Sequence, residues 1–164
     1  MDNNKIIFKA LQLESEHKSG KQYLAIVDFS RSADQHRFFI VDLHNKNIHY
    51  SWWTSHGSGS GSVQRAMLFS NVNMSKKSSL GLMKTGVTYS GKYGLSRKLH
   101  GLEAQNSNVE KRAIVIHPSD YVTREWIKAN RYPGRSQGCI TLNPPDRDYI
   151  IKLLEKDTLV YAHQ

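Results

Sequence analysis

The chain has 164 residues, of which 38% are hydrophobic and 23% charged, and it carries a formal net charge of +9. These values are typical of one soluble globular domain, and they argue against a wholly disordered chain and a membrane protein with apolar spans. The single cysteine excludes an intrachain disulfide framework and a multi-cysteine zinc or iron–sulfur site.

The N-terminal part of the chain predicts one helix followed by strands. Apolar residues between 4 and 17 recur at the spacing of an amphipathic helix, and the Ser19-Gly20 pair ends it. The period then changes to that of β-structure, with short polar turns that indicate antiparallel hairpins or a meander. The three expected strands are residues 23–29, 37–43 and 48–54.

Residues 55–62 read Ser-His-Gly-Ser-Gly-Ser-Gly-Ser, a run that is either a flexible linker or a loop that approaches a ligand. Ordered-looking sequence flanks the run on both sides, and no shift in composition marks two domains. We therefore favour the ligand loop over the linker.

The second half of the chain predicts more strands and two further helices. The prolines and acids of residues 143–146 suit the first turn of a helix, which we expect to extend to about residue 156. The remaining expected elements are a β pair (79–83 and 86–89), strands 93–101, 112–117 and 159–162, a helical segment 119–128, and a loop 131–139. The predicted fold is mostly β with about three helices, α+β by content. It forms a single domain over residues 1–164, with residues 1–20 as an N-terminal helical appendage.

Cys139 lies between Gly138 and the start of an expected strand, Ile140-Thr141-Leu142, at a predicted junction of loop and strand. A lone cysteine is most often a small buried hydrophobe. Here the glycine permits a tight turn whose backbone N–H groups can face a developing oxyanion. Arg135 raises the local positive potential, which favours the nucleophilic thiolate.

A thiol nucleophile needs a base, and His117 ends the apolar strand 112–116. The residue is either a satisfied structural histidine or the base of a Cys–His pair; the cysteine loop downstream favours the pair. The third member, which orients the imidazole, is expected to be a backbone carbonyl or the hydroxyl of Ser136.

His117 followed by Ser136-Gln137-Gly138-Cys139-Ile140 resembles the signature of the L,D-transpeptidase catalytic domain (the YkuD-like family). Further blocks resemble one branch of that family, and the resemblance covers roughly residues 23–162. These blocks are residues 55–61, 69–71, 77–81, 89–94, 99–103, 112–117 and 134–136.

The resemblance implies a mostly β fold, a sandwich or mixed sheet, that acts on peptidoglycan stem peptides without a cofactor or metal. It implies that Cys139 attacks the tetrapeptide and releases D-alanine, while His117 serves as base and acid, Ser136 orients His117, and the N–H groups of Gly138 and Cys139 form the oxyanion hole. An amine acceptor gives a 3-3 cross-link, water gives carboxypeptidase activity, and a D-amino acid gives exchange. Acylation by carbapenems is also implied.

Two positions depart from the common family pattern, because Gln137 replaces a frequent histidine and Thr141 a frequent Arg or Asn. Both are expected to shape the substrate pocket. Arg135 is our candidate for pairing with a stem carboxylate, with a solvated loop charge as the alternative. His56 and Gly57 are expected to line the donor site, with a surface loop as the alternative.

Several other functions were weighed. The glycine-rich run lacks the ending of a P-loop and the spacing of a dinucleotide fingerprint, no two histidines have helical metal spacing, and the basic aromatic sequence does not make nucleic acid the main partner. A non-catalytic wall-binding module and a wall-targeting interbacterial toxin remain alternatives. We expect action in the periplasm or cell envelope. Residues 1–8 contain no signal-like apolar run. From the residues alone, the protein either stays in the cytosol or has an export signal that is removed or bypassed.

Overall fold

A computed structural model describes residues 1–164, which form one eight-stranded mixed sheet and three α-helices. The strand order is β3-β2-β1-β8-β4-β5-β6-β7, with parallel pairing only between β1 and β8 and between β6 and β7. The strands are β1 (Tyr23–Asp28), β2 (Phe38–Asp42), β3 (Asn47–Trp52), β4 (Gly81–Gly91), β5 (Gly94–Gly101), β6 (Val115–Pro118), β7 (Ile140–Leu142) and β8 (Leu159–His163). The predicted mostly β fold with about three helices is confirmed, with the strands joined in one sheet.

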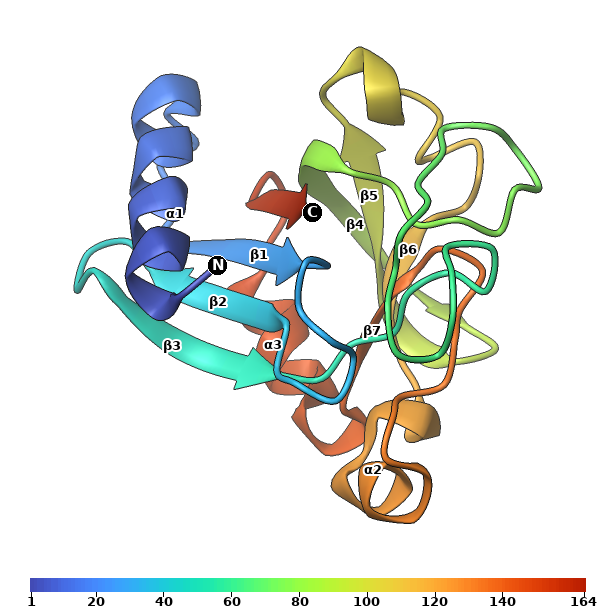
Figure 1. The fold of residues 1–164 in the computed structure, drawn as a ribbon. Coiled ribbons are helices and arrows are strands. Elements are labelled where there is room, and N and C mark those ends of the chain that lie inside the picture. Colours follow the sequence, from blue (N-terminus) through green and yellow to red (C-terminus); the bar gives the residue numbers. More distant parts are fainter.

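The helix α1 (Asn3–His17) packs on one face of β1 and β2 (Figure 1). Its buried residues Ile6, Ala10 and Leu13 recur at helical spacing and form a small core with Leu24 and Phe39. Asp2 caps the helix, because its carboxylate accepts a hydrogen bond from the Lys5 amide at 2.9 Å. The first twenty residues therefore cover the sheet.

The larger core lies on the other face and draws on almost the whole sheet together with α3 (Arg147–Leu153). Ala25 and Val27 of β1 face this core, whereas Leu24 and Ile26 between them face α1. Because successive side chains of a strand point to opposite faces, a strand covered on both sides reads as a continuous apolar run. That pattern explains why the sequence alone predicted the strands β1 and β2.

Four predicted elements differ in their bounds. The β pair at 79–89 is one long strand, β4, and the helical segment at 119–128 is a 3₁₀ turn followed by α2 (Arg124–Asn130). The helix from residue 143 begins as a 3₁₀ turn and becomes α3, which ends at Leu153. The strand expected from residue 112 begins at Val115, because Ala113 has a positive φ of 53°. None of the helices combines the length and hydropathy that a bilayer span requires.

Candidate active site

The adjacent strands β6 and β7 bring His117 and Cys139 together. They pair in parallel, with Ile116 opposite Ile140 and His117 opposite Thr141. Cys139 comes one residue before β7, so this register places it beside Val115. Since side chains alternate along a strand, Val115, His117 and Cys139 leave the same face of the sheet.

His117 and Cys139 line one cavity of about 380 Å³. Its walls come from the turn between β4 and β5, from β6 and the turn before it, from the 3₁₀ turn before α2 and from the loop that ends at Cys139. The other residues that line it are Lys92, Tyr93, Arg112, Ala113, Ile114, Tyr121, Arg135, Ser136 and Gln137. The thiol and the imidazole are therefore exposed to one common space.

The ring of His117 is held in one orientation. Its Nδ1 lies 2.8 Å from the carbonyl oxygen of Pro118, and Tyr93 stacks on the ring with centroids 4.4 Å apart. A carbonyl only accepts hydrogen bonds, so Nδ1 carries the proton, and Nε2, which has no partner within the chain, carries the lone pair. Burial, with a smaller effect of Lys92, lowers the pKa of His117 below its ordinary value, against the Pro118 bond that raises it. The imidazole is neutral at pH 7.

Cys139 carries a partly buried thiol. Its Sγ lies 3.6 Å from the carbonyl oxygen of Ala113, and no hydrogen bond joins it to His117. Burial raises the pKa of the Cys139 thiol, while the Val115 amide and the Arg112 guanidinium lower it by a smaller amount. The cation that acts on the thiol is thus Arg112, whereas the sequence had suggested Arg135. A protonated thiol must lose its proton to a base before it attacks a carbonyl carbon.

Ser136 organises the turn before the cysteine and forms no hydrogen bond with His117. Its hydroxyl donates to the carbonyl oxygen of Cys139 at 2.8 Å and accepts from the Gly138 amide at 3.1 Å. Of the two orienting groups that the sequence allowed, the backbone carbonyl is the one that contacts the imidazole. The prediction that Ser136 orients His117 is therefore wrong.

The turn at Gly138 requires glycine. Its φ is +118°, and an added Cβ would lie 2.7 Å from Ile114 Cδ1 and from the Lys77 carbonyl oxygen. Because Ser136 already accepts the Gly138 N–H, that amide is not free for an oxyanion as expected. The Cys139 amide makes no hydrogen bond within the chain and keeps its donor.

His56 lies away from the cavity and is 1% exposed. Its Nδ1 accepts from Arg37 Nη2 at 2.7 Å, and its Nε2 donates to the carbonyl oxygen of Ser62 at 2.8 Å. Burial, followed by the charge of Arg37, lowers the pKa of His56 to about 4. Both ring nitrogens are used inside the protein, so the prediction of a substrate-binding His56 is wrong.

Gly57 is also structural. It forms a parallel bridge with Ser136, and an added Cβ would lie 2.2 Å from the carbonyl oxygen of Lys76. The glycine-rich run is therefore packed against the loop of Cys139 and supports the site from behind. It is neither a linker nor part of the cavity wall.

Thr141 is fully buried below the site. Its hydroxyl donates to Ser55 Oγ at 3.0 Å and accepts from the Ser55 amide at 2.9 Å. The predicted role in the substrate pocket is wrong, because side chain and backbone of Thr141 fasten β7 to the segment after β3.

Arg135 and Gln137 do line the cavity, and both are exposed. One guanidinium nitrogen of Arg135, Nη1, donates to the carbonyl oxygen of Gly61 at 2.8 Å. No acidic group in the chain pairs with Arg135, so its role toward a carboxylate stays a prediction, as does that of Gln137.

Arg112 is the residue that sequence reasoning missed. Its guanidinium donates to Ser79 Oγ at 2.8 Å, to Ser75 Oγ at 3.1 Å and to two carbonyl oxygens of the same segment, those of Ser70 and Lys77. It therefore fixes residues 70–79 beside the cavity. The sequence gave one usable signal: a charged residue that opens an apolar stretch otherwise suited to a buried strand.

Tyr93 and Tyr121 were also not singled out, although each gives one wall of the cavity beside His117. No group of three or more His, Cys, Asp or Glu side chains is arranged to hold a metal ion.

A thiol and an imidazole with a free nitrogen, both facing one cavity on a mixed β-sheet, are the groups that cysteine acyltransferases and cysteine hydrolases use. The family profile described as the L,D-transpeptidase catalytic domain matches residues 3–163. The chain therefore belongs to the L,D-transpeptidase catalytic domain family, as the sequence motifs indicated. No curated protein matches the chain.

Solved structures share the fold at low sequence identity. An L,D-transpeptidase from Mycobacterium smegmatis is 10% identical with a TM-score of 0.54, over 87% of this chain and 59% of that one. One from Mycobacterium tuberculosis H37Rv is 12% identical with a TM-score of 0.56, over 87% and 58%. One from Stackebrandtia nassauensis is 14% identical with a TM-score of 0.52, over 88% and 56%. The chain thus spans little more than half the length of these relatives.

Proposed function

We propose that the chain is a cysteine-dependent peptidoglycan L,D-transpeptidase or L,D-carboxypeptidase that acts on tetrapeptide stems. The observation that carries this proposal is that Cys139 Sγ and the free Nε2 of His117 face one cavity in a member of this family. The relatives support the substrate class, because the structures that share the fold are L,D-transpeptidases.

The first half-reaction uses the protonation states of the two groups. Cys139 is a thiol and His117 a neutral imidazole, so Nε2 takes the thiol proton as sulfur attacks the stem carbonyl carbon. The Cys139 N–H, which has no partner in the chain, is the available donor to the oxyanion. As the C–N bond breaks, the imidazolium returns its proton to the amine of the departing D-alanine, and the acyl group stays on sulfur.

In the second half-reaction an acceptor attacks the thioester and His117 again acts as base. A stem amine gives a 3-3 cross-link, a free D-amino acid gives exchange, and water gives a tripeptide. The fixed ring orientation suits both steps, because the Pro118 carbonyl stabilises the imidazolium that forms in each.

Two further properties belong to the same proposal. The substrate places the protein in the periplasm or elsewhere in the cell envelope. β-Lactams of the carbapenem type should acylate Cys139; one relative with a TM-score of 0.56, an L,D-transpeptidase 3 from Mycobacterium tuberculosis, was solved with a faropenem-derived adduct.

The test is incubation of the protein with bacterial sacculi, followed by muramidase digestion and mass spectrometry, beside Cys139→Ala. Conversion of tetrapeptides to tripeptides indicates carboxypeptidase activity, and new 3-3 dimers or exchanged D-residues indicate transpeptidase activity. Identical products from wild type and variant would contradict the proposal and favour a wall-binding module. Growth arrest on expression directed to the periplasm, absent for Cys139→Ala, would indicate use as a toxin.

A further inference from the structure

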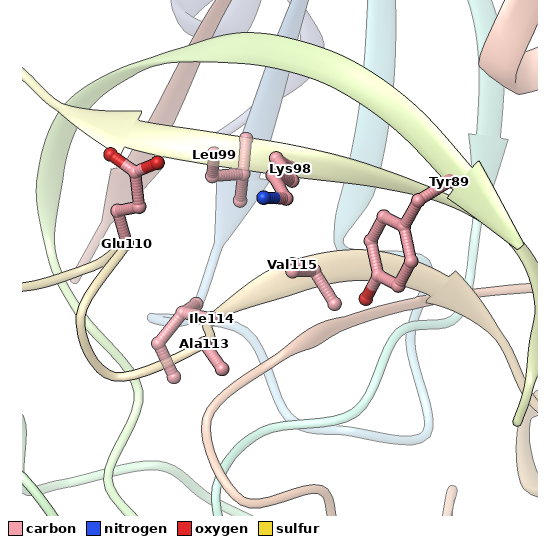
Figure 2. Close-up of a pocket in the computed structure, with 7 residues that line it drawn as sticks. All are labelled: Tyr89, Lys98, Leu99, Glu110, Ala113, Ile114 and Val115. Atoms are coloured by element: carbon pink, nitrogen blue, oxygen red, sulfur yellow. The ribbon is translucent and has the colours of Figure 1, made fainter. Parts of the chain in front are cut away.

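A second cavity, of about 260 Å³, lies beside the catalytic one (Figure 2). It is open between β5 and the segment before β6, and most of its walls are apolar. Its lining residues are Tyr89, Lys98, Leu99, Glu110, Ala113, Ile114 and Val115. We call it the β5–β6 pocket.

The β5–β6 pocket is on the side of the sheet that carries the reactive groups. Lys98 pairs with Val115 across β5 and β6, and Val115 neighbours Cys139 in the register of β6 and β7. The Val115 amide acts on the Cys139 thiol, and Ala113, whose carbonyl oxygen lies 3.6 Å from Sγ, lines both cavities together with Ile114. A molecule in this pocket therefore lies against the segment whose carbonyl oxygen contacts the sulfur.

Two charged side chains border the apolar walls. The ammonium of Lys98 forms no ion pair or hydrogen bond within the chain, and its side chain extends into the β5–β6 pocket between Tyr89 and Glu110 (Figure 2). Glu110 is different, because its Oε2 is engaged by His100 Nδ1 at 2.9 Å. The pocket thus offers one free positive charge and an apolar surface made mainly by Val115, Ile114 and Tyr89.

We propose that the β5–β6 pocket is the acceptor subsite and that it takes an α-amino acid acceptor with an extended apolar side chain, whose carboxylate pairs with Lys98. This inference rests on the proposed function. The acceptor places its amine at the thioester on Cys139, its carboxylate on the Lys98 ammonium and its side chain against Val115 and Tyr89. Both a free D-amino acid and the D-centre of a diaminopimelate side chain have these three parts.

The acceptor amine captures the acyl group from Cys139. The neutral amine attacks the acyl carbon, an amide C–N bond forms and the C–S bond breaks. His117 Nε2 takes the proton that the amine loses and returns it to the sulfur, which regenerates the thiol. A lysine that holds the acceptor carboxylate changes the capture of the acyl-enzyme and leaves its formation unchanged.

The size of the pocket and its charge predict two preferences. A side chain such as that of D-methionine buries several methylene-sized groups that D-alanine lacks, so exchange with D-methionine should exceed exchange with D-alanine at least about tenfold at equal concentration. D-Methioninamide has the same side chain without the carboxylate, and should be a poorer acceptor than D-methionine by about tenfold.

The experiment compares wild type with Lys98→Met, and uses Lys152→Met as a control that removes one exposed positive charge from α3. Purified tetrapeptide muropeptide is incubated with D-methionine, D-methioninamide or deuterium-labelled D-alanine, and mass spectrometry quantifies the released unlabelled D-alanine and the exchanged product separately. Lys98→Met should lose the preference for D-methionine over its amide and keep the rate of D-alanine release. Tyr89→Ser, which shortens the apolar wall at an exposed position, should reduce the preference for D-methionine over D-alanine.

Equal losses of D-alanine release and exchange in Lys98→Met would overturn the proposal, because the pocket would then serve the donor or the fold. Unchanged acceptor preferences in both variants would overturn it as well. A binding measurement keeps this result separate from the proposed function: ligand-observed NMR should detect D-methionine on wild type and on Cys139→Ala, and weaker binding to Lys98→Met. Absence of such binding to wild type refutes the subsite, whereas binding without any turnover of stems refutes only the proposed function.

Discussion

Two buried histidines, at opposite sides of the loop that carries the cysteine, have much in common. His56 and His117 are 1% and 3% exposed, each has a pKa that burial lowers, and each has a ring nitrogen bonded to a backbone carbonyl. They differ in the other ring nitrogen. In His56 it accepts from Arg37, whereas in His117 it is free and its ring lines the catalytic cavity.

The comparison shows which property would mark the histidine that the proposed function makes the base. Burial and a lowered pKa are shared, so neither distinguishes a base from a structural residue. What distinguishes the two is a ring nitrogen whose lone pair is unoccupied and whose ring shares a cavity with a thiol. The region of His56 uses its polar groups to hold a loop, and the region of His117 leaves one polar atom available for chemistry.

The largest expected effect on turnover comes from removing the side chain of Cys139 or of His117. Cys139→Ala should lower D-alanine release from tetrapeptide stems at least about a thousandfold, and His117→Ala by about a hundredfold to ten-thousandfold. Steady-state assays with muropeptides measure both losses, and the double variant should be hardly worse than Cys139→Ala. Full activity in either single variant would refute the pair.

Substitution of the structural histidine should affect stability instead. His56→Phe removes one of the two acceptors of Arg37 Nη2 and leaves only the Thr54 carbonyl oxygen, next to a buried Nη1 that already has no partner. The free energy of unfolding should fall by about 2–4 kcal/mol. Urea denaturation measures this loss. The turnover of the folded variant should stay within about threefold of wild type; a loss of the size found for His117→Ala would assign His56 a role in the reaction.

Acid should lower the stability of the protein through His56. The pKa of His56 falls from 6.5 to about 4 on folding, so the unfolded chain binds more protons between these values. The stability contributed by neutral His56 is present above pH 6.5 and is lost as the pH falls toward 4, by up to about 3 kcal/mol. The stability difference between wild type and His56→Phe should therefore narrow over this range. A difference in the free energy of unfolding that stays constant from pH 7 to 4 would contradict the lowered pKa of His56.

The smallest effect concerns the cation beside the thiol. Arg112→Met should raise the pKa of Cys139, because a favourable charge near the thiolate is lost. The pH dependence of iodoacetamide labelling measures this pKa. Arg112→Lys keeps the charge but not the four hydrogen bonds to residues 70–79, so it should change the pKa less. Equal shifts in both variants would mean that loop position, rather than charge, controls the thiol.

The sequence predicted that Cys139 and His117 share one site, and the two residues line one cavity, whereas most of the surroundings were missed, for a physical reason. Cys139 and His117 lie next to strands, and a parallel register carries strand neighbours to the same face. His56, Gly57 and Thr141 were assigned to the pocket because they flank it in sequence. The side chains of His56 and Thr141 are in fact buried and held by Arg37, on the turn before β2, and by Ser55, after β3. Gly57 packs against the backbone of Lys76.

The fold was predicted well where burial covers both faces of a strand and less well at strand ends. The turn at Ala113 interrupts an apolar stretch that otherwise reads as a strand from residue 112, and local propensity contains no sign of its positive φ. That turn brings the carbonyl oxygen of Ala113 to Cys139 Sγ and places Arg112 beside the thiol. The misjudged boundary therefore concealed two contacts of the nucleophile.

The position of β8 has a consequence for how the molecule is assembled. This strand follows all the others along the chain, yet it lies between β1 and β4 in the centre of the sheet. The β1–β3 meander and the β4–β7 half, which holds the nucleophile, become one sheet only when residues 159–163 are inserted. Sheets built from such distant contacts fold slowly, because the loop entropy is lost before the contacts form. The reactive thiol should therefore reach its final surroundings late in folding, after the ribosome has synthesised the segment that joins the two halves.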